Sequence, residues 1–568
     1  MIVVGLSPTA HESAVGVVVD GAIVAAASEE RFTRVKNQDG FPHQALEFCL
    51  ARAGVTAADV DHVAYAALPF ATERRRDLRC FAANVAYVVG NGDSLTRRAA
   101  HLANYGRSLA LTREWTSWGA SERALRRELD ARGLGGKLVF VDHHRAHCAS
   151  AYYASGFDRA LVVSLDGYGS GNAGAVHVGE HGRLRPVVSI PYPHSLGTFY
   201  RRVTTALGFT PNRHEGKVVG LAAYGDPARL GHDVLQRFDL SGPDHYRCRS
   251  GQDPYFARHL ADRHPAEDVA AACQHALEHV AVTYVRRWLA RTGTDRVACA
   301  GGVFANVKLN QRLVQLPEVA ETFVFPAMGD SGVGVGAALA LSADLGVPRA
   351  DPLPTVFLGP DFTPDEVERA VRGSGLAFSR PADIDAAVAG LLAEGRVVAR
   401  VSGRGEFGPR ALGNRSILAP ASDLAVTEHL NRRLRRSEFM PFAPATLDDA
   451  GAALYADVGK FRHAGRFMTV ATDCLPAMRA ASPACVHVDG TARPQLVTPA
   501  ASPGLHRVLT EYRRRTGLAS VLNTSFNIHE EPIVNSPDDA VQAFRTAGLD
   551  ALALGDFLLE PPNGEGRR

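Results

Sequence analysis

Several features that would place a protein in a particular class are missing from this sequence. Its eight cysteines are scattered and no two form a Cys-x-x-Cys pair, which argues against a disulfide framework and against a cysteine-ligated zinc site. No apolar run reaches the roughly 18 residues that a membrane-spanning helix needs. No basic segment precedes the first apolar residues, as it would in a signal peptide. We therefore expect a reduced, cytoplasmic protein with no membrane partner.

A strong charge of either sign is also missing. The 62 Lys and Arg residues nearly balance the 60 Asp and Glu residues, and the net charge of +2 gives no reason to expect a nucleic-acid partner. What the chain does have is size. Its 568 residues, 46% of them hydrophobic, are enough for two or more domains with sizeable cores.

The N-terminal residues have the pattern of three consecutive strands. Residues 2–6, 14–19 and 22–28 are apolar, and Asp20-Gly21 is a tight-turn signal between the second and the third. The same pattern of apolar runs and glycine turns returns between residues 160 and 190. This repetition predicts an internally duplicated α/β domain.

Two later segments have helical patterns. An Arg-rich insert at about residues 71–134 looks helical, and residues 266–291 have the 3.6-residue apolar spacing of a long helix. A third helix is expected at about residues 365–371, with Thr363 as its N-cap and Pro364 as its first residue.

The best linker candidate is Asp351-Pro352-Leu353-Pro354, because it lies between two segments of regular pattern and contains two prolines. Alternating strands and turns follow it. We therefore expect two domains, with boundaries at residues 1–352 and 353–568.

Two histidines mark a candidate metal site. His143 and His147 follow a short apolar strand and project from one face of the expected helix, because they are four residues apart. Asp166 and Asp330 each follow another apolar strand and stand next to glycines. Two imidazoles and two carboxylates at strand ends suit a divalent metal with open coordination positions. The alternative is that the histidines are capping or core residues.

Three polar segments are candidates for contact with phosphate or a planar ligand. Gly301-Gly302 lies between a strand and a helix, where backbone N–H groups could face a phosphate or simply form a turn. Residues 402–415 place three arginines among four glycines, which suits phosphate and carboxylate oxygens but is also found in ion-paired loops. The run 522–527 ends a strand in polar groups that could orient an amide-like ligand or cap the next segment.

The motifs taken together resemble one family. They occur at residues 11–14, 29–36, 142–147, 215–222, 301–303, 406–417, 489–495 and 523–534. In this order, and over essentially the whole chain, they resemble the O-carbamoyltransferases of antibiotic and nodulation-factor biosynthesis, the family of the tobramycin, cephamycin and novobiocin carbamoyltransferases. The stretch EFGPRALGNRSI at residues 406–417 is the most specific of them.

The resemblance implies an ATP-dependent enzyme with two domains. The first is expected to have an actin-like, duplicated α/β fold, like the metalloprotein that completes tRNA threonylcarbamoyladenosine. The second is expected to be an α/β domain similar to the synthase that makes carbamoyl-type adenylates. Carbamoyl phosphate and ATP, with Mg2+, would give carbamoyl-adenylate and pyrophosphate in the second domain. The carbamoyl group would then move to a hydroxyl of a small-molecule natural product in the first domain, and AMP would leave.

The resemblance also implies roles for individual residues. An iron-type divalent metal, Fe2+, would be held by His143, His147, Asp166 and Asp330. Catalytic roles would belong to His11, Lys36 and Asp166, with His11 and Lys36 beside the transferred group. Nucleotide and carbamoyl phosphate binding would fall to Lys217, Gly301, Gly302, Asn306, Arg404, Arg410, Arg415, Thr491, Arg493, Asn523, Ser525 and Asn527.

The chain departs from the family pattern in two places. The family commonly has Lys-x-Arg-Glu-x-x-Arg before Pro-Phe, whereas here Leu434, Ser437 and Met440 replace the first Lys, the Glu and the last Arg. That replacement puts part of the phosphate site in doubt, and Arg435 is the candidate to substitute. Glu530 also stands in place of a frequent glycine.

Two other functions stay open at this stage. Both domains have relatives in tRNA modification, although the balanced charge and the lack of a long basic stripe count against that function. A catalytically inactive nucleotide-binding scaffold would account for the departures at Leu434 and Met440. The expected partners are ATP, carbamoyl phosphate and a hydroxylated acceptor, bound by a monomer or a homodimer. The acceptor itself is not identified by the sequence, although the insert at residues 71–134 is expected to shape its pocket.

Overall fold

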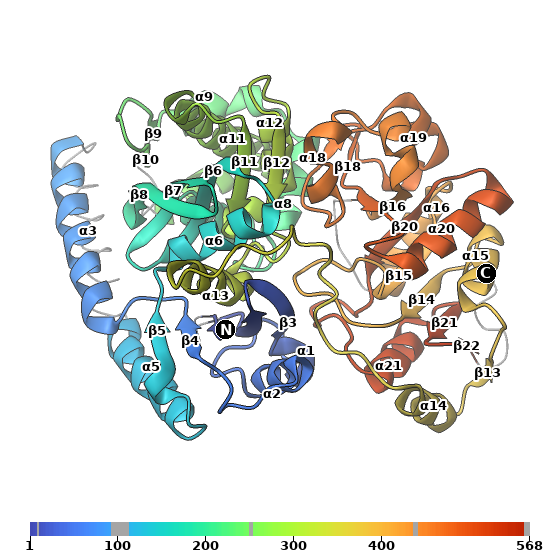
Figure 1. The fold of residues 1–568 in the computed structure, drawn as a ribbon. Helices are drawn as coiled ribbons and strands as arrows, with labels where there is room; N and C mark the ends of the chain where they lie inside the picture. Colours follow the sequence, from blue (N-terminus) through green and yellow to red (C-terminus); the bar gives the residue numbers. More distant parts are fainter. Residues whose placement is uncertain (8–10, 92–112, 249–253, 435–440, 562–568) are drawn as a thin grey trace. The chain divides into compact units, whose positions relative to one another are not determined.

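The structure, a computed structural model, is a mixed α/β protein of helices and several sheets (Figure 1). It describes residues 1–568 except 8–10, 92–112, 249–253, 435–440 and 562–568. The chain divides into two compact units. The first comprises Met1–Val24, Asp39–Pro42 and Leu50–Pro352, and the second comprises Ala25–Gln38, His43–Cys49 and Leu353–Arg568.

Two sheets of the first unit have the same strand order. One runs β3-β2-β1-β4-β5 and the other β8-β7-β6-β11-β12, each with an antiparallel hairpin beside parallel strands. The first sheet consists of β1 (Ile2–Leu6), β2 (Ala14–Val19), β3 (Ala22–Ser28, which enters the second unit at Ala25), β4 (His62–Tyr65) and β5 (Leu138–Phe140). The second consists of β6 (Arg159–Gly169), β7 (Asn172–Glu180), β8 (Arg183–Pro191), β11 (Arg296–Ala300) and β12 (Glu321–Val324). The predicted internal duplication is therefore confirmed by the topology.

Helices of the first unit connect these strands and include the predicted long helix. They are α3 (Phe70–Asn91), α5 (Arg113–Asp130), α6 (His143–Ser155), α7 (Leu196–Ala206), α8 (Glu215–Leu221), α9 (Gly231–Leu235), α10 (Pro254–Ala261), α11 (Ala266–Thr292), α12 (Val307–Val314) and α13 (Val333–Asp344). A small hairpin of β9 (Phe238–Asp239) and β10 (Arg247–Cys248) lies outside both sheets. The predicted helical insert forms α3 and α5, and its middle lies outside the described residues.

Glycines let two elements approach α13 closely. A Cβ atom at Gly336 of α13 would lie 1.9 Å from the carbonyl oxygen of Ala146 in α6, and one at Gly5 of β1 would lie 1.9 Å from the carbonyl oxygen of Gly334. Any larger residue at Gly336 would therefore push α6 and α13 apart. This close packing matters for function, because α6 begins with the two histidines and α13 follows directly after Asp330.

The second unit is built around one mixed sheet. Among the described residues this sheet has eight strands, in the order β13-β22-β21-β14-β15-β20-β16-β19. Their bounds are β13 (Ala377–Ser379), β14 (Val398–Val401), β15 (Arg415–Pro420), β16 (Ala443–Leu447), β19 (Gln495–Val497), β20 (Ser520–Ser525), β21 (Ala551–Leu554) and β22 (Phe557–Glu560). A separate pair is formed by β17 (Thr472–Asp473) and β18 (Thr491–Ala492).

The core of this unit lies between the sheet and two helices. Apolar residues of α15 (Ile384–Ala393) and α20 (Pro503–Thr516) pack with the strands, and Leu392, Leu505 and Tyr512 are at most 2% exposed. The predicted helix after the linker is confirmed as α14 (Pro364–Gly373), which Thr363 and Glu366 start with a reciprocal capping box. The other helices are α16 (Ala425–Arg433), α17 (Gly451–Leu454), α18 (Val458–Gly465), α19 (Pro476–Ala481) and α21 (Pro537–Ala547).

The second unit is not one continuous stretch of chain. Residues 25–38, which include α1 (Glu30–Thr33), are attached to it by hydrogen bonds. Arg34 donates to the carbonyl oxygens of Ile533 and Pro532, at 2.6 and 2.8 Å, and Ala26 N donates to Leu358 O. The next helix, α2 (His43–Ala53), begins in this unit as well. A single break between residues 352 and 353 therefore does not describe the division of the chain completely.

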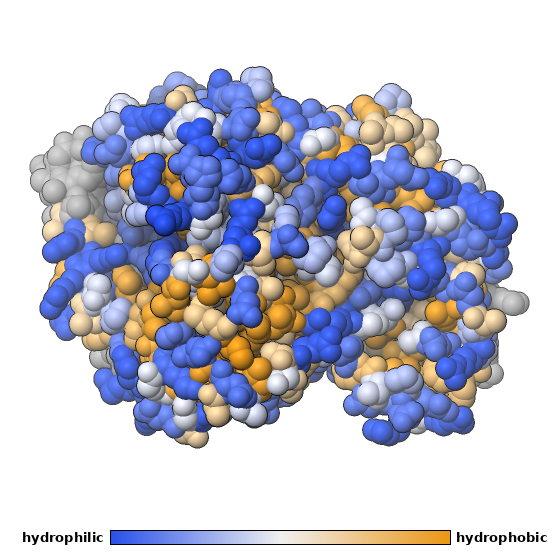
Figure 2. Space-filling model, viewed as in Figure 1, coloured by the Kyte–Doolittle hydropathy of each residue, from blue (hydrophilic) through white to orange (hydrophobic). Residues whose placement is uncertain are grey.

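One face of the surface carries residues of both polar and apolar character (Figure 2). On the face drawn in Figure 2, hydrophilic residues are interspersed with hydrophobic ones. Within the described ranges, no helix combines the length and the apolar character that crossing a bilayer requires.

Candidate active site

The two histidines are placed by the start of α6. Asp142 is the N-cap of this helix, and its carboxylate accepts hydrogen bonds from the backbone N–H groups of His144 and Arg145, both at 3.1 Å. The cap makes the helix begin directly after β5, with His143 in its first turn. His143 and His147 then lie on the same helix face, with their ring centroids 4.7 Å apart.

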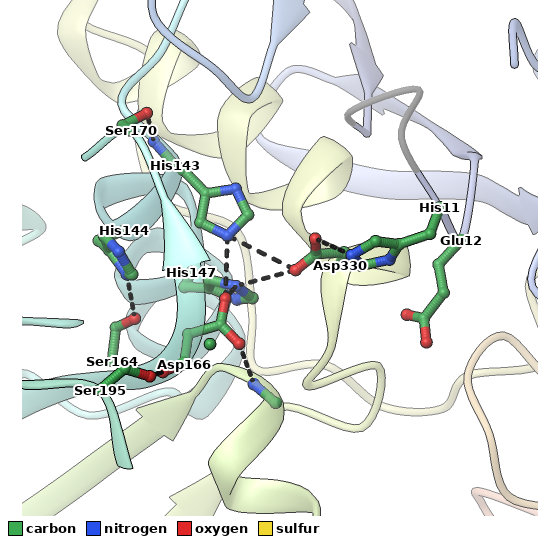
Figure 3. Close-up of polar contacts among 12 residues, drawn as sticks. His11, Glu12, His143, His144, His147, Ser164, Asp166, Ser170, Ser195 and Asp330 are labelled. Carbon is green, nitrogen blue, oxygen red and sulfur yellow. Dashed lines mark hydrogen bonds and ion pairs between the residues drawn. The ribbon is translucent and has the colours of Figure 1, made fainter. Parts of the chain in front are cut away.

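Asp166 and Asp330 meet these histidines in a buried cluster (Figure 3). His143 Nε2 lies 3.1 Å from Asp166 Oδ2 and 3.5 Å from Asp330 Oδ1, and the corresponding distances for His147 Nε2 are 3.3 and 3.6 Å. One donor atom from each of the four residues lies within 4.8 Å of the others. Two nitrogen and two carboxylate oxygen donors at this spacing fit a divalent metal such as Fe2+.

Protonation of the cluster follows from its buried charges. Burial lowers the pKa of His143, but Asp330 and Asp166 outweigh it and raise that pKa to about 9. Burial opposes the charge on Asp166 as well, but hydrogen bonds from His143 and His147 hold its pKa well below the usual range. His144 is different, because burial and the neighbouring His143 lower its pKa to about 4. Its Nδ1 contacts Ser164 Oγ at 3.0 Å, so His144 does not belong to the donor set.

A backbone amide and a side-chain hydroxyl orient Asp166. The N–H of Gly302 donates to Asp166 Oδ1 at 3.0 Å, and the hydroxyl of Ser195 donates to the Asp166 carbonyl at 2.8 Å. The N–H of Gly301 donates to Met328 O. The two amides of Gly301-Gly302, which the sequence suggested for a phosphate, are therefore directed at protein acceptors.

His11 lies on the other side of Asp330. Its Nε2 is 3.5 Å from Asp330 Oδ2, and its side chain is 52% exposed (Figure 3). The neighbouring Glu12 accepts a hydrogen bond from Ser331 N at 3.3 Å and has a left-handed backbone, with φ of 52°. Sequence reasoning gave Glu12 no role of its own, although it lies in the motif at residues 11–14.

The remaining candidates of the N-terminal part have contacts of their own. Lys36 belongs to the second unit, where its Nζ lies 3.6 Å from Glu30 Oε1. Lys217 is buried in α8. Asn306 caps α12 and exchanges hydrogen bonds with Gln274 at 2.8 and 3.1 Å, so its polar groups serve the packing of helices.

In the second unit, the loop between β14 and β15 is organised by Glu406. Its Oε1 accepts hydrogen bonds from the backbone N–H groups of Leu412, Asn414 and Arg415, at 2.8, 2.8 and 3.1 Å. From the sequence, the arginines among the glycines of this loop were expected to suit phosphate and carboxylate oxygens. At these three positions the backbone amides face a carboxylate of the same loop, and the sequence reasoning did not foresee this role of Glu406.

The side chain of Arg415 stabilises the same loop by donating hydrogen bonds to backbone carbonyl oxygens. Its side chain is 1% exposed, and burial lowers its pKa to about 10. The guanidinium donates to the carbonyl oxygens of Ser402, Gly403, Asn414, Pro360 and Asn535. The fork that was expected to bind phosphate is therefore used for backbone contacts.

The other binding candidates lie around this loop. Arg404 donates to Leu358 O at 2.7 Å, while Arg410 and Arg493 are partly exposed. The amide of Asn523 donates to Ala411 O at 3.2 Å, which ties β20 to the loop. These contacts bring the loop and β20 together.

Three further candidates are held by near neighbours. The Ser525 hydroxyl donates to Asn527 Oδ1 at 2.6 Å, and that of Thr491 donates to Asp489 Oδ1 at 2.6 Å. Of the positions that depart from the family pattern, Leu434 is buried at the end of α16, whereas Arg435, Ser437 and Met440 lie outside the described residues.

The role of Arg415 can be tested through stability. Arg415→Met should lower the free energy of unfolding by roughly 3 kcal/mol or more, because each buried carbonyl that loses its donor costs about 1–3 kcal/mol. Urea unfolding should detect this loss, and Arg372→Met, whose side chain is 66% exposed, is the matched control. Unchanged stability together with lost nucleotide binding would instead assign Arg415 to the ligand.

The protonation of His143 predicts a proton release. Because its pKa is raised to about 9, His143 carries a proton at pH 7 in the metal-free protein. Binding of a divalent metal should therefore release about one proton, and the apparent affinity should rise about tenfold per pH unit below pH 9. Calorimetry in buffers of different ionisation enthalpy measures this release. Binding without a released proton would mean that His143 is not a ligand.

Comparisons with known proteins show the family of the chain. The family model described as the carbamoyltransferase N-terminus matches residues 2–339, and that of the carbamoyltransferase C-terminus matches residues 389–561. Nodulation protein NolNO of Sinorhizobium fredii is 34% identical over 97% of this chain and 79% of its own length. The 3'-hydroxymethylcephem-O-carbamoyltransferase of Streptomyces clavuligerus is 30% identical over 74% of this chain and 80% of its own. Nodulation protein NolO of Bradyrhizobium diazoefficiens is 36% identical over 74% of this chain and 78% of its own. The chain belongs to the O-carbamoyltransferase family that its motifs resemble, and it is a carbamoyltransferase.

Proposed function

We propose that this protein is an ATP-dependent O-carbamoyltransferase that modifies a hydroxyl group of a small-molecule natural product. In the first step, carbamoyl phosphate, ATP and water give carbamoyl-adenylate, pyrophosphate and inorganic phosphate. In the second, the acceptor hydroxyl oxygen attacks the carbamoyl carbon, the bond to the AMP phosphate oxygen breaks, and AMP leaves. The observation that carries the proposal is the convergence of His143, His147, Asp166 and Asp330 in a chain of this family.

We assign the transfer step to the first unit, which we propose to be actin-like. A divalent metal held by the four donors would polarise the carbamoyl carbonyl oxygen, where negative charge develops during the attack. His11 is suited to take the proton of the acceptor hydroxyl, because its exposed imidazole lies beside Asp330 Oδ2. Gly302 and Ser195 keep Asp166 oriented toward the histidines during the reaction.

We assign adenylate formation to the second unit, which we propose to resemble the adenylate-forming synthases. ATP and carbamoyl phosphate are polyanions, and guanidinium groups close to a preformed loop suit their oxygens. Arg410 and Arg493 are the proposed contacts, because both are partly exposed and Arg415 is directed at backbone carbonyls. Lys36, which is part of this unit and lies 3.6 Å from Glu30 Oε1, is proposed as a further contact for the same anions.

Loss of a metal ligand should separate the two steps. His143→Ala and Asp330→Ala should lose bound metal and carbamoyl transfer but should still release pyrophosphate, because the other site lies in the second unit. Elemental analysis and a pyrophosphate assay measure the two properties, and His181→Ala, with a side chain that is 79% exposed, is the control. Carbamoyl transfer by a variant without detectable metal would show that the reaction does not require the metal.

Loss of a guanidinium group should affect the other step. Arg410→Ala or Arg493→Ala should abolish ATP–pyrophosphate exchange, because phosphate charge left unpaired at a desolvated site costs roughly 2–5 kcal/mol. Metal content should stay at the wild-type level. The matched control is Arg372→Ala, an exposed arginine of the same unit. Unchanged exchange in both variants would show that the adenylate binds elsewhere.

A further inference from the structure

One face of α3 carries a row of side chains that all contact the surroundings of the metal candidates. The row begins at Glu73 and continues three, four and seven residues later with Arg76, Asp77 and Cys80. At this spacing the four side chains project from the same side of the helix. This helix opens the insert whose middle lies outside the described residues. The contacts of this face are one described connection between the insert and the rest of the first unit, and another is Arg126 of α5, which lies over the ring of Phe140.

Arg76 contacts both elements that flank His143. Its guanidinium donates to Asp142 Oδ2 at 2.6 Å and to the carbonyl oxygen of Ser170 at 3.3 Å. Asp142 is the cap that starts α6 one residue before His143, and Ser170 Oγ accepts a hydrogen bond from the backbone N–H of His143 at 3.3 Å. Arg76 thus connects the helix that carries two ligands to the end of β6, which carries a third.

A second contact fixes the end of β6. The hydroxyl of Tyr168 lies 3.0 Å from Glu73 Oε1 and 3.0 Å from Asp77 Oδ1, and the Cys80 thiol donates to Gly171 O at 3.2 Å. Tyr168 follows Asp166 by two residues in β6, within the irregular stretch where the pairing with β7 shifts register, so a contact at Tyr168 holds the backbone close to the ligand. Movement of α3 would therefore be transmitted to Asp166.

Tyr168 stands between two carboxyl groups. One phenol has one proton, so its hydroxyl can donate fully to only one of them, and a proton on Glu73 or Asp77 would allow both contacts to be hydrogen bonds. Glu73 is 2% exposed, and burial raises its pKa to about 8 against the lowering effect of the Tyr168 hydrogen bond. Asp77 and Asp142 raise that pKa further, while His143 lowers it. A protonated Glu73 would not be repelled by Asp77 and could exchange a hydrogen bond with Tyr168 at this partly buried junction.

We propose that α3 is a positioning helix of the metal centre, which sets the orientation of His143 through Arg76 and of Asp166 through Tyr168. The inference rests on the proposed metal-dependent function and adds to it the residues that position the metal ligands. The insert is thereby linked mechanically to the site of carbamoyl transfer. Loss of the Arg76 guanidinium or of the Tyr168 hydroxyl should alter metal binding even though neither residue is a ligand.

The test uses Co2+ as a probe, because its visible absorption reports ligand number and geometry without any measurement of activity. In the full-length protein, Arg76→Ala should weaken Co2+ binding by roughly 10–100-fold, as expected when a group that orients a ligand is lost. The visible spectrum should also change in shape. Arg75→Ala, an exposed arginine next to it on the same helix, should bind Co2+ like the wild type.

Two further variants keep the result interpretable if Arg76→Ala is unstable. Tyr168→Phe removes only the phenol hydroxyl and should change the Co2+ spectrum. Glu73→Gln mimics the protonated carboxyl group and should retain the wild-type spectrum. If wild-type protein binds Co2+ and both Arg76→Ala and Tyr168→Phe bind it with unchanged affinity and spectrum, the positioning role is wrong while the proposed metal site stands. If wild-type protein binds no Co2+, both the metal site and the inference drawn from it are overturned.

Discussion

Two carboxylates buried side by side are the constraint on which the first unit depends. Asp166 and Asp330 share a site that solvent barely reaches, where like charges repel strongly unless positive charge lies between them. In the metal-free protein, the proton on His143 supplies that charge, and the raised pKa of His143 and the lowered pKa of Asp166 are two results of the same pairing. A divalent ion would replace one proton by two charges on the same donors. The electrostatic strain that the cluster tolerates without metal is therefore also the source of its expected affinity for metal.

The donors meet because backbones approach closely in the surrounding fold. His143 and His147 come from α6, Asp166 from β6 and Asp330 from the turn before α13. The helices α6 and α13 are in close contact at Gly336, where a larger side chain would overlap with Ala146. Gly169 has a similar role, since a Cβ atom there would lie 2.1 Å from the His143 ring. Close packing at two glycines thus fixes the position of side chains that lie far apart in the sequence.

The sequence predicted the helices and strands better than it predicted which hydrogen-bond donors could contact a ligand. The three N-terminal strands, their repetition and the helix capped by Thr363 follow from local patterns, and the structure contains them all. The spacing of His143 and His147 predicted their shared face for the same reason. The roles of Glu406, Arg415 and the Gly301-Gly302 amides were not predictable, because each depends on an acceptor or donor that only the folded chain brings near. The residue types in a sequence indicate which hydrogen-bond donors could bind a ligand. The packing of the folded chain determines whether those donors bond to protein acceptors instead.

The placement of residues 25–38 has a consequence for how the two steps can be separated. These residues belong to the second unit, where Arg34 donates to carbonyl oxygens of residues 532 and 533, and Arg31 donates to Gly408 O in the loop organised by Glu406. A cut between residues 352 and 353 would leave these carbonyls without their donors and would expose the loop on which the proposed adenylate site depends. The expected division of labour between two halves of the chain is thus a division between folded units, not between two consecutive stretches of sequence. A C-terminal fragment that makes adenylate alone would need the segment from Ala25 to Gln38 supplied with it.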